Sequence, residues 1–124
     1  MYEPVGQAVW IAARAAGAEA MVLEPSLAQR NAARRTGTLA VSSADPVKAL
    51  AKIIEWTGGG PPDVAIDTAD VHAEFRDALA PVARRGRLFV VGPSERRPSY
   101  PEGFPAPREI GALGVSCCTH EEFA

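Results

Sequence analysis

The chain has 124 residues, which is enough for one globular domain with a single core. Apolar residues make up 47%, charged residues 23%, and the formal net charge is −2, so the composition argues against a disordered chain and against a basic surface for nucleic acid or anionic membranes. No apolar run approaches the roughly 18 residues of a membrane span, and the first residues lack the basic start of a secretory signal. We therefore expect a cytoplasmic protein without nucleic-acid or membrane partners.

Helical and strand patterns alternate along the first half of the chain. Helix boundaries are marked by capping residues, by proline just inside a start and by glycine after an end. In chain order the signals predict a helix over 4–16 with its exit at Gly17, a strand over 19–23, a helix from Ser26 to about Arg35 ended by Gly37, a strand over 38–42, and a helix from Asp45-Pro46 to Gly58. In the helix that begins at Asp45-Pro46, Val47, Leu50 and Ile54 are expected to share one face.

The second half continues the alternation. In chain order it predicts a strand over 63–67, a helix with the stripe Val71, Phe75, Leu79 and Val82 that Pro81 kinks or ends, a strand over 87–91, a loop over 93–108, a strand over 110–115 and a first helical turn over 120–124. Five of the eleven prolines lie in 93–108, which forbids regular structure there. Strands that alternate with helices predict βαβ units and a parallel sheet, hence an α/β fold.

Two residues have the spacing of a dinucleotide site. Gly6 follows the start of the first helix, where it would be the third glycine of G-x-G-x-x-G, and a helix N-terminus offers unpaired N–H groups to a pyrophosphate. Glu24 lies 18 residues further on, at the end of a predicted strand. A carboxylate at about this spacing accepts hydrogen bonds from ribose hydroxyls and repels a 2′-phosphate, so the pattern favours NAD over NADP.

Six short motifs occur in a characteristic order over nearly the whole chain. They are Pro4-Val5-Gly6, Ala16-Gly17-Ala18, Glu24-Pro25-Ser26, Asp63-Val64-Ala65-Ile66-Asp67, Gly86-Arg87-Leu88-Phe89-Val90-Val91-Gly92, and Arg108-Glu109-Ile110 with Gly114. The series resembles the nucleotide-binding domain of medium-chain dehydrogenases of the zinc-type alcohol and sorbitol dehydrogenase kind. The resemblance implies a Rossmann-like doubly wound parallel sheet over residues 1–124, with a proline-rich loop at 93–108.

The resemblance also implies roles for individual residues. Val5 and Gly6 would border the pyrophosphate, Glu24 would hold the adenosine ribose, Thr68 and Ala69 would border the adenine, and Val91 and Gly92 would approach the nicotinamide amide through backbone groups. In the family, NAD takes a hydride from an alcohol carbon while zinc, held by a separate catalytic domain, polarises the oxygen. The chain is therefore expected to orient the cofactor and to contribute no catalytic residue and no metal ligand.

Several positions depart from the family pattern. Its first two fingerprint glycines fall at Met1 and Glu3, Asp70 replaces a usual glycine, and its first strand would lie before Met1. Without that central strand, strands two and three are separated from strands four, five and six, unless strands two and four pair directly. The departures predict a domain fragment with an incomplete sheet that binds NAD weakly or not at all.

Other interpretations of the same residues are open. Cys117, Cys118 and His120 are too closely spaced for a typical structural zinc site, so we expect buried cysteines there. His72 is expected at the surface or as a cap. The chain could instead be a non-catalytic remnant or self-association module that forms a homodimer through the edge strand 110–115, or a methyltransferase-type Rossmann domain.

Overall fold

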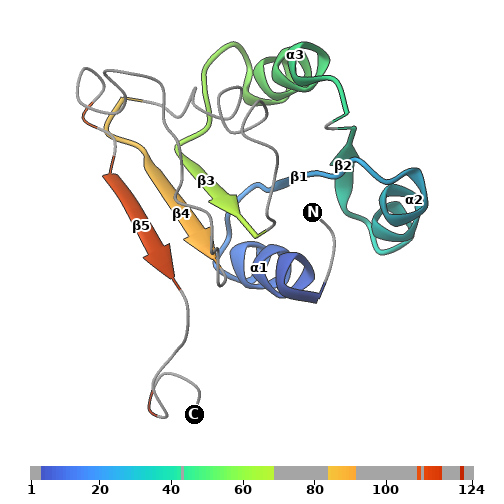
Figure 1. Ribbon diagram of the computed structural model, residues 1–124, viewed down its shortest axis with the longest axis horizontal. Helices are drawn as coiled ribbons and strands as arrows, with labels where there is room; N and C mark the ends of the chain where they lie inside the picture. Colours follow the sequence, from blue (N-terminus) through green and yellow to red (C-terminus); the bar gives the residue numbers. More distant parts are fainter. Residues whose placement is uncertain are drawn as a thin grey trace. The chain divides into compact units, whose positions relative to one another are not determined.

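The computed structural model describes residues 4–42, 44–68, 84–91, 109, 111–115 and 121. The chain forms two compact units, Met1–Pro61 and Pro62–Ala124. The helices and strands among the described residues are α1 (Pro4–Ala15), β1 (Met21–Leu23), α2 (Leu27–Arg35), β2 (Leu39–Val41), α3 (Pro46–Thr57), β3 (Val64–Asp67), β4 (Arg87–Val91) and β5 (Gly111–Val115), as labelled in Figure 1. None of the described helices is both long and apolar enough to span a membrane.

The predicted end of the first helix is confirmed. Gly17 has a φ of 83°, a conformation that a side chain disfavours, and it lies just after α1. The amide of Gly17 donates to the carbonyl of Arg14 at 3.0 Å, and the amide of Ala18 donates to the carbonyl of Ala13 at 3.0 Å. These bonds satisfy carbonyl groups that the end of a helix leaves open, and they turn the chain toward β1.

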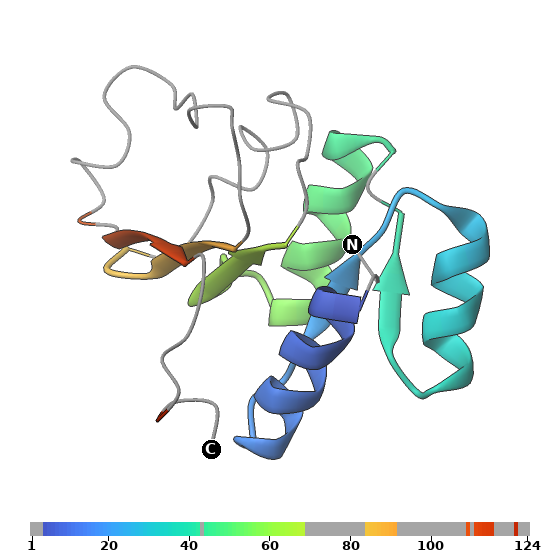
Figure 2. The same ribbon diagram turned by 60° about the horizontal axis from the view of Figure 1, so that its bottom comes forward.

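Strands β1 and β2 form a parallel pair in which Val22 lies opposite Ala40. Helix α2 connects them and packs closely against β2, as Figure 2 shows. The contact is small: Ala33 of α2 is fully buried, Ala40 of β2 is 2% exposed, and Val22 packs against both. The side chains of Ala33 and Ala40 are single methyl groups. Because they are small, the backbone of the helix can approach the strand closely.

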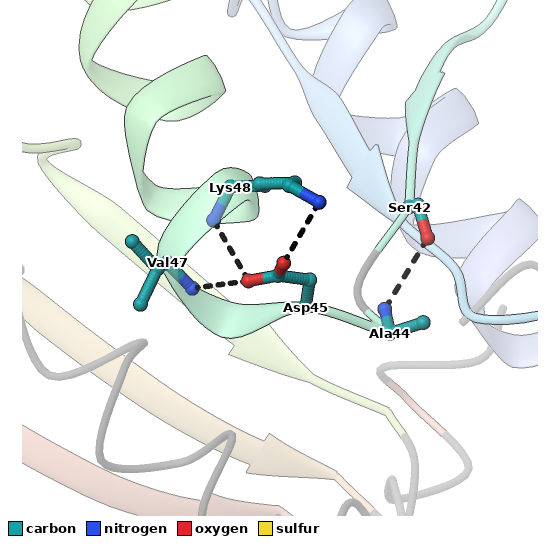
Figure 3. A network of polar contacts seen from close by, with 5 residues as sticks. All are labelled: Ser42, Ala44, Asp45, Val47 and Lys48. Carbon is teal, nitrogen blue, oxygen red and sulfur yellow. Dashed lines mark hydrogen bonds and ion pairs between the residues drawn. The ribbon is translucent and has the colours of Figure 1, made fainter.

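Helix α3 begins as the Asp45-Pro46 pair predicts. The Asp45 carboxylate accepts hydrogen bonds from the amides of Val47 and Lys48, both at 3.1 Å, and pairs with the Lys48 ammonium at 3.2 Å (Figure 3). Gly58 ends the helix with a φ of 78°. Both boundaries therefore follow from capping residues that the sequence identifies.

The buried face of α3 differs from the expected stripe. Ala49 and Ile53, four residues apart, are 2% and 6% exposed, whereas Val47 is 78% exposed and Ile54 is 41% exposed. Several apolar residues surround this helix, so more than one stripe fits a helical period. Among these, the structure buries the stripe with Ala49 and Ile53.

Strands β3, β4 and β5 lie side by side in that order and run parallel (Figure 1). The register places Ile66, Phe89 and Leu113 in one row across the sheet. Residues in register in a parallel sheet share a face, so this row belongs to a single apolar face. The two outer side chains of the row are exposed to solvent, Ile66 at 41% and Leu113 at 58%.

All described ladders are parallel, and they form two sheets, β1-β2 and β3-β4-β5. This is the α/β fold that the sequence predicts, with strand pairing as in an incomplete Rossmann-like sheet. The alternative in which the strands now labelled β1 and β3 pair directly is not found among the described strands. The predicted helix over 71–82, the loop over 93–108 and, apart from Glu121, the turn over 120–124 lie outside the described residues.

Candidate functional site

Glu24 is the largest fully buried side chain among the described residues, with 1% of its surface exposed. It follows β1 directly, and its amide extends the ladder by donating to the carbonyl of Val41 at 3.0 Å. Its carboxylate Oε1 accepts a hydrogen bond from the amide of Ser26 at 2.7 Å. A buried carboxylate needs such partners, because burial without them is costly. The side chain is therefore held in a defined orientation at the carboxyl end of β1.

The loop that carries Glu24 is tied to the first turns of α2. The Ser26 hydroxyl accepts from the amide of Gln29, and the Ser26 carbonyl accepts from the amide of Arg30 at 2.9 Å. The Arg30 guanidinium reaches back, and its Nη1 donates to the carbonyls of Glu24 at 2.8 Å and Pro25 at 2.7 Å. The Ser26 cap was predicted from the sequence. The role of Arg30 was missed, because nothing in the sequence gives the direction in which α2 leaves the loop.

The N-terminus of α1 supplies the second part of the predicted site. Gly6 is the buried residue of this helix, whereas Val5 is 48% exposed. No acidic side chain lies in the first turn of the helix as described. Figure 2 shows α1 and β1 running in opposite directions, so the start of α1 and the carboxyl end of β1 lie at the same end of this unit. The structure therefore brings Val5 and Gly6 to the end that holds Glu24.

The remaining described site residues belong to the three-stranded sheet. Thr68 follows β3 and Val91 is the last residue of β4, and the register pairs Asp67 with Val90. The carboxyl ends of adjacent parallel strands meet at one edge, so Thr68 and Val91 lie at the same edge of their sheet. Asp67, the last residue of β3, is 6% exposed.

Other residues considered in the sequence lie outside the described part of the chain. They are Glu3, Ala69, Asp70, His72, Gly92, Cys117, Cys118 and His120. Among the described residues, no group of three or more histidine, cysteine, aspartate or glutamate side chains has the arrangement of a metal site. The roles expected of Ala69 and Gly92, and of the cysteines, stay predictions.

Comparison with known proteins extends the resemblance that the motifs indicate. A 2-dehydro-3-deoxy-L-galactonate 5-dehydrogenase from Pseudoalteromonas atlantica is 33% identical over 88 residues, which are 71% of this chain and 26% of that protein. The chain thus spans about a quarter of the length of this relative.

Solved structures show the same fold at lower identity. The crystal structure of AibC matches 98% of this chain with a TM-score of 0.81 and 22% identity, and the match covers 34% of that chain. An alcohol dehydrogenase zinc-binding domain protein from Burkholderia ambifaria matches 93% of this chain and 32% of its own, with a TM-score of 0.75 and 22% identity. A structure of an NAD-dependent alcohol dehydrogenase matches 90% of this chain and 33% of its own, with a TM-score of 0.71 and 20% identity.

A family model decides the assignment. The model described as "Zinc-binding dehydrogenase" matches residues 4–124, which is nearly the whole chain. This match favours the dehydrogenase interpretation over a methyltransferase-type domain, and it agrees with the parallel ladders and with the order of the motifs. The chain belongs to the zinc-binding dehydrogenase family of oxidoreductases.

Proposed function

We propose that this chain is the NAD-binding part of an alcohol dehydrogenase-like oxidoreductase. The observation that carries the proposal is Glu24: a carboxylate at the carboxyl end of a parallel strand, buried and held by the Ser26 amide at the entrance to a helix. In doubly wound folds this is the place where a carboxylate accepts hydrogen bonds from the adenosine ribose. Family membership supports this use of the position.

The chemical groups of the described residues suit the binding of a dinucleotide. Glu24 is an acceptor for sugar hydroxyls, and Gly6 is a buried position without a side chain in the first turn of α1, where amide groups open to an anion. Val5 would border the pyrophosphate with Gly6. From the resemblance, Thr68 and Ala69 would border the adenine, and Val91 and Gly92 would approach the nicotinamide.

The chemistry of the proposed reaction belongs to the cofactor. NAD, when bound, accepts a hydride from an alcohol carbon, and the residues named here bind and orient it. We assign none of them a catalytic role. No described residue indicates which substrate is used. The sugar acid in the name of the Pseudoalteromonas relative belongs to that protein.

The proposal includes a cofactor preference and a strength of binding. A carboxylate beside the ribose repels a 2′-phosphate, so NAD is preferred over NADP. Glu24 is only 1% exposed, and a sugar must displace the groups that cover it before it reaches the carboxylate. This displacement reduces the net affinity, and we expect the chain to bind NAD weakly, in the millimolar range.

A titration followed by amide NMR tests the proposal. NAD and AMP at millimolar concentration should shift the amide signals of Glu24 and Ser26, and NADP should shift them less. The Glu24→Gln variant keeps an oxygen acceptor for the Ser26 amide but removes the charge, so its preference for NAD over NADP should disappear. Unchanged Glu24 and Ser26 signals at saturating nucleotide would overturn the proposal. Tight binding would contradict the argument from burial.

A second candidate function is self-association. β5 is an edge strand of the three-stranded sheet, and two of its apolar side chains, Leu113 and Val115, are 58% and 36% exposed. An edge strand with open backbone groups and exposed apolar side chains can pair with a second copy. Sedimentation over a range of concentrations tests this: a dimer is expected that Leu113→Lys weakens, and a monomer at all concentrations would exclude it.

A further inference from the structure

The loop between β1 and α2 depends on a single side chain of α2. Nη1 of Arg30 donates to the carbonyls of both Glu24 and Pro25, at 2.8 and 2.7 Å, while its own amide donates to the carbonyl of Ser26 at 2.9 Å. The side chain therefore holds the carbonyls of two loop residues, and the bond to Ser26 is a main-chain bond of the helix. The carbonyl of Pro25 is thus held by a side chain.

The Arg30 contacts bear on the orientation of the Glu24 carboxylate. Oε1 of Glu24 accepts from the amide of Ser26 at 2.7 Å, a bond that requires the Glu24–Pro25 and Pro25–Ser26 peptides to keep their orientations. Arg30 fixes the carbonyl oxygens of those same two peptides. Hydrogen bonds from a charged donor are stronger than those between neutral groups.

We propose that Arg30 is a positioning residue for Glu24, which sets the geometry of the acceptor for the nucleotide sugar. This inference rests on the proposed function for its consequence on binding. Its structural part, that Arg30 holds the Ser26 amide on the Glu24 carboxylate, stands on the contacts of this loop alone. Arg30 itself touches no ligand in this scheme and acts through the orientation of Glu24.

Arg34 provides a matched control on the same helix. Its Nη2 donates to the carbonyl of Ala40 at 2.9 Å, again six residues away in sequence, and that carbonyl belongs to β2 rather than to the Glu24 loop. Arg30→Ala and Arg34→Ala thus each remove a guanidinium from α2 and its hydrogen bonds to main-chain carbonyls. A merely structural role of Arg30 predicts the same outcome for both variants.

The experiment measures two quantities in the 124-residue chain by NMR. They are the hydrogen-exchange rate of the Ser26 amide and the affinity for AMP. Arg30→Ala should accelerate exchange at Ser26 by about tenfold and weaken AMP binding by about tenfold, since each follows from the lost charged hydrogen bonds. Arg34→Ala should change the Ser26 exchange rate and the AMP affinity only as far as it lowers the stability of the whole chain. Arg30→Lys should recover most of both, because both carbonyl bonds come from one nitrogen, which an ammonium can replace.

The outcomes separate this inference from the proposed function. If the unsubstituted chain shows no AMP binding, the proposed function falls, and the Ser26 exchange rate alone decides the role of Arg30. If Arg30→Ala does not fold, Arg30→Gln, which keeps the stem and an amide donor, takes its place. Equal effects of the Arg30 and Arg34 variants on Ser26 exchange, or an unchanged Ser26 rate, overturn the inference.

Discussion

Arg85 and Glu109 are joined by a side-chain hydrogen bond, and both have a left-handed backbone. Nε of Arg85 donates to Oε2 of Glu109 at 2.8 Å, and the φ angles are 64° and 54°. The register of β4 and β5 pairs Arg87 with Gly111, so the pair lies two residues before each strand, in continuation of the ladder. The turns that start the two strands thus have the same backbone handedness and are bridged by opposite charges.

The first prediction separates the backbone strain at Arg85 from its ion pair. Arg85→Ala and Arg85→Gly both remove the ion pair, but only glycine relieves the left-handed conformation, which costs about 1 kcal/mol or more for other residues. Arg85→Gly should therefore be more stable than Arg85→Ala by about 1 kcal/mol in equilibrium urea unfolding. Equal stabilities would mean that the positive φ at this position is not maintained. The lost pair itself should matter little, because the Arg85 side chain is 78% exposed.

The second prediction concerns the end of α3. Gly58 has a φ of 78° and Gly60 does not have a positive φ, while an added Cβ meets nothing within 4 Å at either position. Gly58→Ala should destabilise the chain by about 1 kcal/mol because of the backbone conformation alone. Gly60→Ala, the control, should be neutral or slightly stabilising. Thermal unfolding of the two variants, measured side by side, gives their losses of stability. Equal losses would contradict the explanation by backbone conformation.

The third prediction is a pH dependence at Asp45. Hydrogen bonding from the Lys48 amide is the main cause that holds the pKa of Asp45 below its ordinary value of 3.8, and the Lys48 side chain adds to it. The folded state therefore binds the proton less tightly than the unfolded state. This contribution to stability is present above the unfolded pKa and is lost as the pH falls through the lower, folded pKa.

The variant Asp45→Asn measures that contribution. Asparagine still caps the helix but carries no charge, so the wild-type chain should be more stable near neutral pH, and its advantage should fade below about pH 4. Urea unfolding of both proteins across this pH range gives the difference directly. An advantage that persists unchanged at the acid end would show that the Asp45 charge is not its source.

The fourth prediction tests the contact between α2 and β2. Ala33 is fully buried against Ala40, whereas Ala28 on the same helix is exposed. Ala33→Leu should cost about 1–3 kcal/mol, since the larger side chain forces the helix away from the strand. Ala28→Leu has the same helix propensity change but meets solvent, and it should leave the stability nearly unchanged. A tolerated leucine at position 33 would show that the close approach is not required.

Local signals in the sequence determined where the described helices begin and end. Pro4, Ser26 and Asp45 mark where helices begin, and Gly17 and Gly58 mark where they end, because capping and left-handed glycine act through neighbours only a few residues away. The spacing from Gly6 to Glu24 likewise identified the end of β1 as the place for a carboxylate. The caps depend on the chain within one turn, and the spacing is a plain count along the chain, so the sequence alone is sufficient for both.

Tertiary structure decided what those elements bury and how the site is held. The choice of Ala49 and Ile53 over Val47 for the buried face of α3 depends on which neighbours cover the helix, and no periodicity contains that information. The hold of Arg30 on the carbonyls of Glu24 and Pro25 depends on the direction in which α2 leaves the loop. Hydrogen bonds and burial depend on three-dimensional proximity, so they become visible only once the chain is folded.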